Sequence, residues 1–93
     1  MITVHVYVKG YLKKYFDRES YSIELESKAT LKDLYEKIDE DLGKNLPPSV
    51  WSHEKKSFRG PVVVKISGES IIDLDFKLQD GSDIILSRLL VGG

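Results

Sequence analysis

The sequence has no cysteine, only three prolines and a single tryptophan, and it has no long apolar run. Without cysteine there are no disulfides, no cysteine nucleophile, no cysteine-ligated zinc and no all-cysteine iron–sulfur cluster. No apolar stretch approaches the ~20 residues that cross a bilayer, and the N-terminus lacks the basic and apolar regions of a signal peptide. We therefore expect a cytoplasmic protein that does not attach to membranes.

An excess of charge of one sign is also missing, because the 93 residues carry a formal net charge of −1. Such a chain has no general attraction to nucleic acid, so we expect none among its partners. Hydrophobic residues make up 41% of the sequence and charged residues 31%, proportions that favour a globular domain over a disordered chain. The length suits one domain with a single core.

Alternation of apolar and polar residues predicts strands at 2–8 and 20–26. A charged connection at 10–19 joins them, and they pair most simply as an antiparallel hairpin. Strand character returns in the second half of the chain. It appears at Val62–Ser67, in a short segment at Ser70–Ile72 and around Ile84 and Leu86, with a turn at Asp80–Gly81 before the last of these.

One helix is predicted between the two groups of strands. Thr30 is a suitable N-cap, and Asp33 stands three positions later, as in a capping box. An apolar stripe follows at helical spacing, formed by Leu31, Leu34, Tyr35, Ile38 and Leu42. Gly43 is predicted to end the helix in a left-handed conformation.

Residues 44–60 are predicted to be irregular, because Pro47–Pro48 cannot donate two successive backbone hydrogen bonds. We expect Trp51 and Phe58 from this stretch to cover an edge of the core. The element order is hairpin, helix, strand, short strand and strand, which predicts an α+β fold. With the first and last strands side by side in the middle, this is a β-grasp fold: a mixed sheet of four to five strands with one main helix packed on one face.

Four segments together resemble the sulfur-carrier branch of the ubiquitin-like superfamily, which includes the small subunit of molybdopterin synthase and the thiamine-pathway sulfur carrier. Lys28–Leu34 (KATLKDL) is similar to the start of the family's helix, and Lys65–Ile71 (KISGESI) to its strand–turn–strand segment. Leu78–Ile84 (LQDGSDI) is similar to the turn before its last strand. The sequence closes on Gly92–Gly93, as the family does.

The resemblance implies that the protein is a carrier and not itself an enzyme. A partner adenylates the carboxylate of Gly93 with ATP, and sulfur borne by the enzyme then converts it to a thiocarboxylate for molybdopterin synthesis or tRNA thiolation. Gly92 and Gly93 lack Cβ atoms, so they suit a tail that threads into a narrow channel. The implied partners are this adenylating enzyme and a large synthase subunit or another sulfur-acceptor enzyme. The chain itself is expected to bind no cofactor and no metal.

We expect residues 1–88 to form the β-grasp domain and residues 89–93 a flexible tail, because terminal glycines have no side chains to anchor them. Apolar residues near such an end suit docking in a groove of a partner. The predicted partner-binding residues are Leu89, Leu90 and Val91 of the tail and His5, Tyr7, Val63 and Ile85 on the open face of the sheet.

Two other functions stay open at this point. In one, the protein is a ubiquitin-like modifier that becomes attached to lysines of target proteins. In the other, it is a β-grasp interaction domain without covalent chemistry. A free thiocarboxylate favours the sulfur carrier, lysine-linked conjugates favour the modifier, and the absence of both favours the interaction domain.

Overall fold

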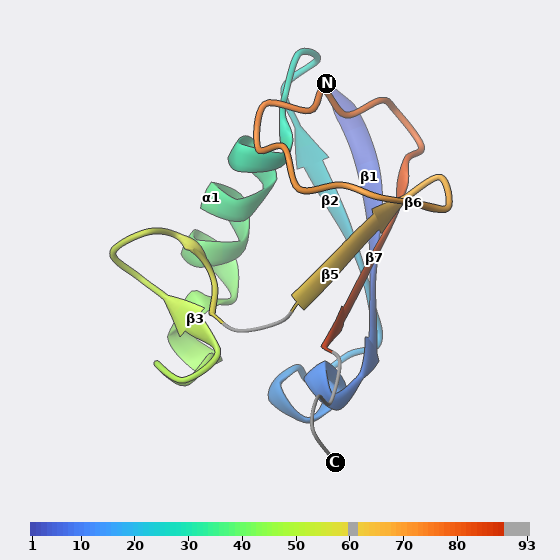
Figure 1. Ribbon diagram of the computed structural model, residues 1–93. Coiled ribbons are helices and arrows are strands. Elements are labelled where there is room, and N and C mark those ends of the chain that lie inside the picture. Colours follow the sequence, from blue (N-terminus) through green and yellow to red (C-terminus); the bar gives the residue numbers. More distant parts are fainter. Residues whose placement is uncertain (60–61, 89–93) are drawn as a thin grey trace.

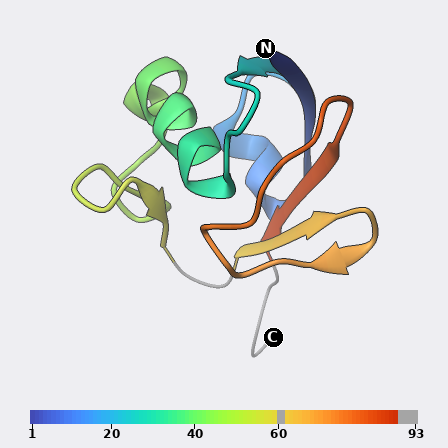
Figure 2. The same cartoon turned by 90° about the horizontal axis from the view of Figure 1, so that it is seen from above.

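The computed structural model describes residues 1–59 and 62–88, in which one main helix covers one face of a five-stranded sheet (Figures 1 and 2). The sheet contains β1 (Ile2–Gly10), β2 (Ser20–Leu25), β5 (Val62–Ile66), β6 (Glu69–Ser70) and β7 (Asp83–Arg88). The helix is α1 (Leu31–Asp41). A separate two-stranded sheet contains β3 (Trp51–Ser52) and β4 (Ser57–Phe58), and two 3-10 helices are η1 (Tyr11–Tyr15) and η2 (Gly43–Asn45).

The sheet is mixed, with the strand order β2-β1-β7-β5-β6. β1 pairs antiparallel with β2 and parallel with β7, and β7 pairs antiparallel with β5. The first and last strands therefore lie side by side in the middle. This arrangement confirms the predicted α+β, β-grasp architecture.

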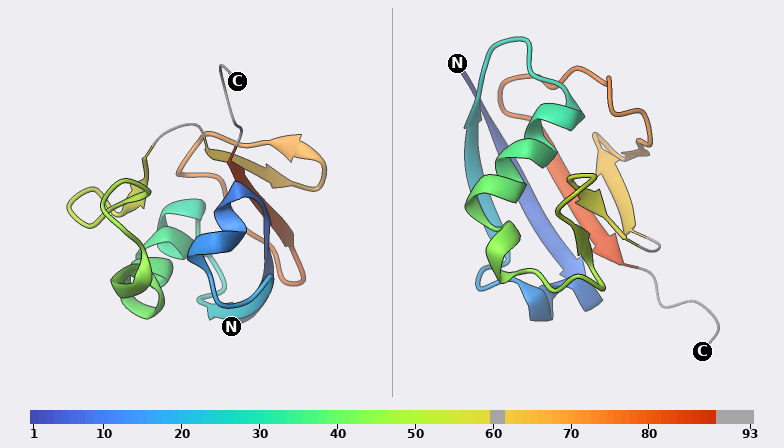
Figure 3. Two further views of the ribbon diagram at one scale, coloured as in Figure 1. Left: turned by 90° about the horizontal axis from the view of Figure 1, so that it is seen from below. Right: turned by 90° about the vertical axis from the view of Figure 1, so that its left-hand side faces the viewer.

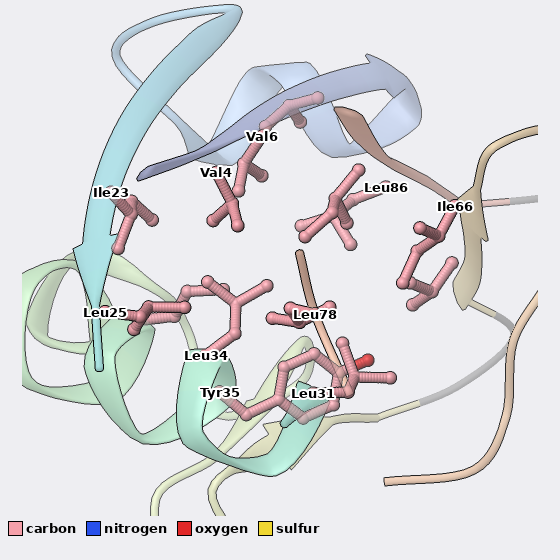
Figure 4. Close-up of a cluster of buried hydrophobic side chains, with 14 of the residues drawn as sticks. Val4, Val6, Ile23, Leu25, Leu31, Leu34, Tyr35, Ile66, Leu78 and Leu86 are labelled. Atoms are coloured by element: carbon pink, nitrogen blue, oxygen red, sulfur yellow. The ribbon is translucent and has the colours of Figure 1, made fainter. Parts of the chain in front are cut away.

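The core lies between the sheet and α1, as Figure 4 shows. The alternating apolar residues of β1 point toward the helix; Val4 and Val6 are almost completely buried. From α1, Leu34 has no exposed surface. The predicted helix stripe is confirmed, although Leu42 beyond its end is only half-buried.

The capping box at the start of α1 is also confirmed. The backbone N–H of Thr30 donates to Asp33 Oδ2 at 2.8 Å, and the backbone N–H of Asp33 donates to Thr30 Oγ1 at 3.4 Å. The next N–H groups, of Leu31 and Lys32, donate at 2.9 Å to carbonyl oxygens in the loop 74–76. The first turn of the helix thus has its backbone donors satisfied without an external ligand.

The predicted role of Gly43 is wrong. The residue has no positive φ; it lies where η2 begins. A Cβ atom at this position would lie 2.9 Å from Asp39 Oδ1 and 3.5 Å from His53 Cε1. Glycine is needed here for close approach of neighbouring side chains, and not for a left-handed backbone.

The segment predicted as irregular contains η2 and the β3–β4 hairpin, which lies beside α1 (Figure 3). Trp51 is completely buried, and its ring contacts Tyr35 and Phe58 edge to face at centroid distances of 5.9 and 4.8 Å. Trp51 and Phe58 therefore cover an edge of the core, as expected. Burial raises the pKa of Tyr35 to about 12.

Candidate functional site

The end of β7 is the point from which the predicted tail continues. Arg88, the last residue of β7, pairs with Gly10 of β1 on one side and with Val62 of β5 on the other. The main chain is therefore held from both sides up to this residue. The tail residues predicted as functional, Gly92 and Gly93 with Leu89, Leu90 and Val91, lie outside the described residues, and their roles remain predictions.

The 3-10 helix η1 lies at the same end of the sheet (Figure 1). Gly10 has φ +63°, a conformation that favours glycine, and it turns the chain from β1 into η1. Leu12 is completely buried and anchors η1 to the core, whereas Tyr11 is 53% exposed. The sequence signal for η1 was Leu12, an apolar residue within the charged connection, and our strand-based reasoning missed it.

The open face of the sheet, opposite α1, brings together the four residues predicted there. Tyr7 and Ile85 are direct neighbours across the parallel β1–β7 pair. Val63 lies one diagonal step from Ile85, because Ile85 pairs with Lys65. His5 precedes Tyr7 on the same face, and all four predicted residues are half-buried.

Two lysines on this face were not predicted as site residues. Lys65 is exposed and directly opposite Ile85, and Lys9 is exposed and opposite Ser87. Alternate residues of a strand share a face, so both lysines lie on the same face as Tyr7. This alternation is visible in the sequence and could have identified them. The candidate surface therefore has an apolar centre at Tyr7 and Ile85 and a mixed charge around it, because the exposed Asp83, opposite His5, lies on the same face as the two lysines.

The two histidines lie on different elements. His5 Nδ1 is 3.3 Å from Ser22 Oγ, and His53 Nδ1 is 3.3 Å from Asp39 Oδ1. Within the described ranges 1–59 and 62–88, no three His, Asp or Glu side chains come together as potential metal ligands.

Asp39 makes a hydrogen-bonded cluster with the β3–β4 hairpin. Its Oδ1 accepts a 2.7 Å hydrogen bond from Trp51 Nε1. This bond, and secondarily the contact with His53, holds the pKa of Asp39 below its ordinary range, against an opposing effect of burial. The carboxylate therefore stays ionised and joins α1 to the hairpin, which is a structural role.

In the part of the chain that the structure describes, no helix has the length and apolar character needed to span a bilayer.

No known protein-family model matches the sequence, and none of the curated proteins matches it either. Solved structures match nearly the whole chain. SAMP1 of Haloferax volcanii is 15% identical, with 98% of this chain and 99% of the other covered, at a TM-score of 0.79. A putative molybdopterin converting factor subunit 1 from Pyrococcus furiosus is 18% identical, with 97% and 100% covered, at a TM-score of 0.72.

A third similar structure is a complex of subunits 1 and 2 of molybdopterin-converting factor from Helicobacter pylori. The matching chain is 23% identical, with 99% of this chain and 100% of that chain covered, at a TM-score of 0.64. At these identities the likeness establishes the fold, and it agrees with the predicted ubiquitin-like β-grasp fold.

Proposed function

We propose that this protein is a cytoplasmic sulfur carrier whose Gly93 carboxylate is activated by a partner enzyme. The observation that carries the proposal is the position of β7. This strand lies at the centre of the sheet, is paired on both sides up to Arg88, and is followed within five residues by Gly92–Gly93. A rigid domain thus fixes the origin of a short glycine-ended segment, as delivery of a carboxylate to another protein's active site requires.

In the proposed reaction, a carboxylate oxygen of Gly93 attacks the α-phosphate of ATP on the partner, and pyrophosphate leaves. A persulfide on the partner then displaces AMP from the acyl carbon to give an acyl disulfide. A second thiol of the partner attacks the S–S bond, which releases the carrier with a thiocarboxylate and leaves a disulfide on the partner. The chain contributes the carboxylate and the surfaces that position it. ATP and the acid–base groups belong to the partner.

The names of similar structures support a choice of pathway. One is described as a putative molybdopterin converting factor subunit 1, and another as a complex of subunits 1 and 2 of molybdopterin-converting factor. We therefore propose molybdopterin synthesis as the first choice, with a large synthase subunit as the second partner and tRNA thiolation as the alternative use of the sulfur. The open face around Tyr7 and Ile85 is the proposed docking surface for these proteins, together with Leu89, Leu90 and Val91.

A second candidate function is attachment to lysines of target proteins. It is favoured by the likeness to SAMP1, a second structure of which is described as small archaeal modifier protein 1. Both functions share the activation step and differ in what accepts the activated carbonyl. Mass spectrometry of the protein from its host separates them, because a carrier yields a terminal thiocarboxylate and a modifier yields lysine-linked conjugates.

The activation step is tested by deleting Gly93 and measuring ATP–pyrophosphate exchange with the purified adenylating enzyme of the same host. We expect exchange to be lost and the melting temperature to stay unchanged. Gly92→Val should slow exchange strongly, because a β-branched side chain restricts the backbone that must enter the channel. His53→Ala is the control and should support normal exchange. A folded Gly93-deleted protein that still supports exchange contradicts the proposal and leaves the non-covalent interaction domain.

A further inference from the structure

The strand β2 forms a free edge of the sheet, because its only partner among the described residues is β1. Val8 N–H donates to the carbonyl of Glu19 at 2.8 Å, which fixes the alternation of the antiparallel ladder. Tyr21 and Ile23 consequently exchange hydrogen bonds with β1, whereas Ser22 and Glu24 direct their backbone N–H and C=O groups outward. These outward groups have no backbone partner within residues 1–59 and 62–88.

A groove lies between the end of β2 and α1, which lie next to each other in Figure 3. It has a volume of about 510 Å³. Leu25 and Ala29 are buried and form its floor, and Glu36 and Glu40 of α1 line one wall. A strand placed beside β2 would direct every second side chain into this groove.

The charge of the groove is mostly negative. Five of its lining residues are carboxylates, against two lysines and the Met1 ammonium group. Lys37 Nζ lies 3.9 Å from Asp41 Oδ2, and the Met1 ammonium donates a hydrogen bond to Ser27 Oγ at 3.1 Å. Because the whole chain carries a net charge of only −1, the groove concentrates acidic groups beside a row of unpaired backbone groups.

We propose that this edge binds an extended, basic segment of a partner protein, which adds a sixth strand beside β2. The outward backbone groups of Ser22 and Glu24 supply main-chain hydrogen bonds. Lysine or arginine side chains at alternate positions of the segment point toward α1 and pair with Glu36 and Glu40, while the side chains between them point to the opposite face of the sheet. This site uses neither the tail nor the open face, so it is independent of the proposed carrier function.

The probe is a synthetic nine-residue peptide that alternates valine and arginine, titrated into the full ¹⁵N-labelled chain. We expect amide shifts concentrated at Ser22 and Glu24 and along α1 near Glu36. A matched peptide with glutamate in place of arginine should bind at least tenfold more weakly. Shifts centred on Tyr7 and Ile85, or equal affinity of the two peptides, would overturn the proposal.

Two variants separate the charge and backbone contributions. Glu36→Lys/Glu40→Lys should weaken binding at least tenfold, whereas Glu54→Lys/Asp75→Lys, which changes the net charge equally at exposed positions elsewhere, should bind normally. Ser22→Pro removes an outward-facing N–H and the hydroxyl that contacts His5, but no backbone hydrogen bond to β1, so it should reduce binding in a folded protein.

If Ser22→Pro does not fold, peptide binding by Glu36→Lys/Glu40→Lys tests the proposal by itself. Retained binding by Glu36→Lys/Glu40→Lys is evidence against the groove. Concentration-dependent self-association that closes the β2 edge, without peptide binding, would show that a second copy and not a basic partner occupies it.

Discussion

Replacing Gly43 by alanine tests whether the contact between α1 and the β3–β4 hairpin determines this glycine. The new Cβ atom would lie 2.9 Å from Asp39 Oδ1, closer than real Cβ contacts allow. The carboxylate cannot move freely, because the same oxygen accepts the 2.7 Å hydrogen bond from Trp51 and contacts His53 at 3.3 Å. Relieving the clash must therefore weaken at least one of these interactions.

The expected magnitude follows from two opposing effects. A hydrogen bond to a charged group contributes about 1.5–3 kcal/mol, and a displaced carboxylate loses part of it. Since Gly43 lacks a positive φ, alanine is compatible with its backbone. Alanine also reduces the conformational entropy of the unfolded chain, which stabilises the folded protein by about 0.4–1 kcal/mol and offsets part of the loss. We expect Gly43→Ala to destabilise the protein by about 1–2 kcal/mol, which lowers the melting temperature by roughly 4–16 °C for a domain of this size.

The same substitution in an Asp39→Ala background should have the opposite sign. Without the carboxylate there is no clash with Oδ1, so Gly43→Ala should be neutral or stabilising by up to about 1 kcal/mol. Urea unfolding of the four proteins of this cycle measures both values, and fluorescence of Trp51, the only tryptophan, reports on the site directly. If Gly43→Ala costs the same in both backgrounds, contact with Asp39 is not the reason for glycine.

Three further outcomes are expected. Leu34→Ala should lower the free energy of unfolding by roughly 2–5 kcal/mol, because Leu34 is completely buried, whereas Lys32→Ala on the exposed face should change it by less than about 0.5 kcal/mol; equal urea midpoints would contradict the helix assignment. The lowered pKa of Asp39 means that its carboxylate stabilises the fold above the ordinary carboxyl pKa and that this contribution is lost as pH falls through the lowered value. The difference in stability between wild type and Asp39→Asn should therefore shrink as pH falls below the ordinary carboxyl pKa and through the lowered one, and a difference independent of pH would refute the ionised state. Ile85→Ser, on the open face, should raise the Kd for the adenylating enzyme about tenfold, or about 1.4 kcal/mol, with little change in melting temperature; unchanged affinity in calorimetry would remove this face from the docking surface.

The sheet and the helix could be predicted because each has a strong local signal. Alternation along β1 fixes which residues face the core, and the pair Thr30 and Asp33 fixes where α1 begins. The central position of β7 is non-local, and it was inferred from the order of elements. The open-face residues followed from the same alternation, which explains why Tyr7 and Ile85 do meet.

Sequence reasoning missed several features, each for a different reason. Gly43 after a helix is typical of a left-handed end, but here Asp39 and His53 occupy the space beside it. The β3–β4 hairpin has only two residues in each strand, too few for a visible period. It is stabilised by the burial of Trp51, which a propensity argument does not register. Lys65 was overlooked although the same alternation that selected Val63 places it on the open face.

The central position of β7 also has a consequence for synthesis of the protein. Its neighbours β1 and β5 are made earlier, and β1 pairs with β7 across a separation of more than 70 residues. At about 5–20 residues per second, β1 waits roughly 4–16 s on the ribosome before its neighbour has been translated. During that time its apolar side chains have no complete core, and they are exposed to chaperones and to other nascent chains. β7, the strand that completes the sheet, ends at Arg88. Its neighbours β1 and β5 can therefore hold Arg88 in place only after folding is complete.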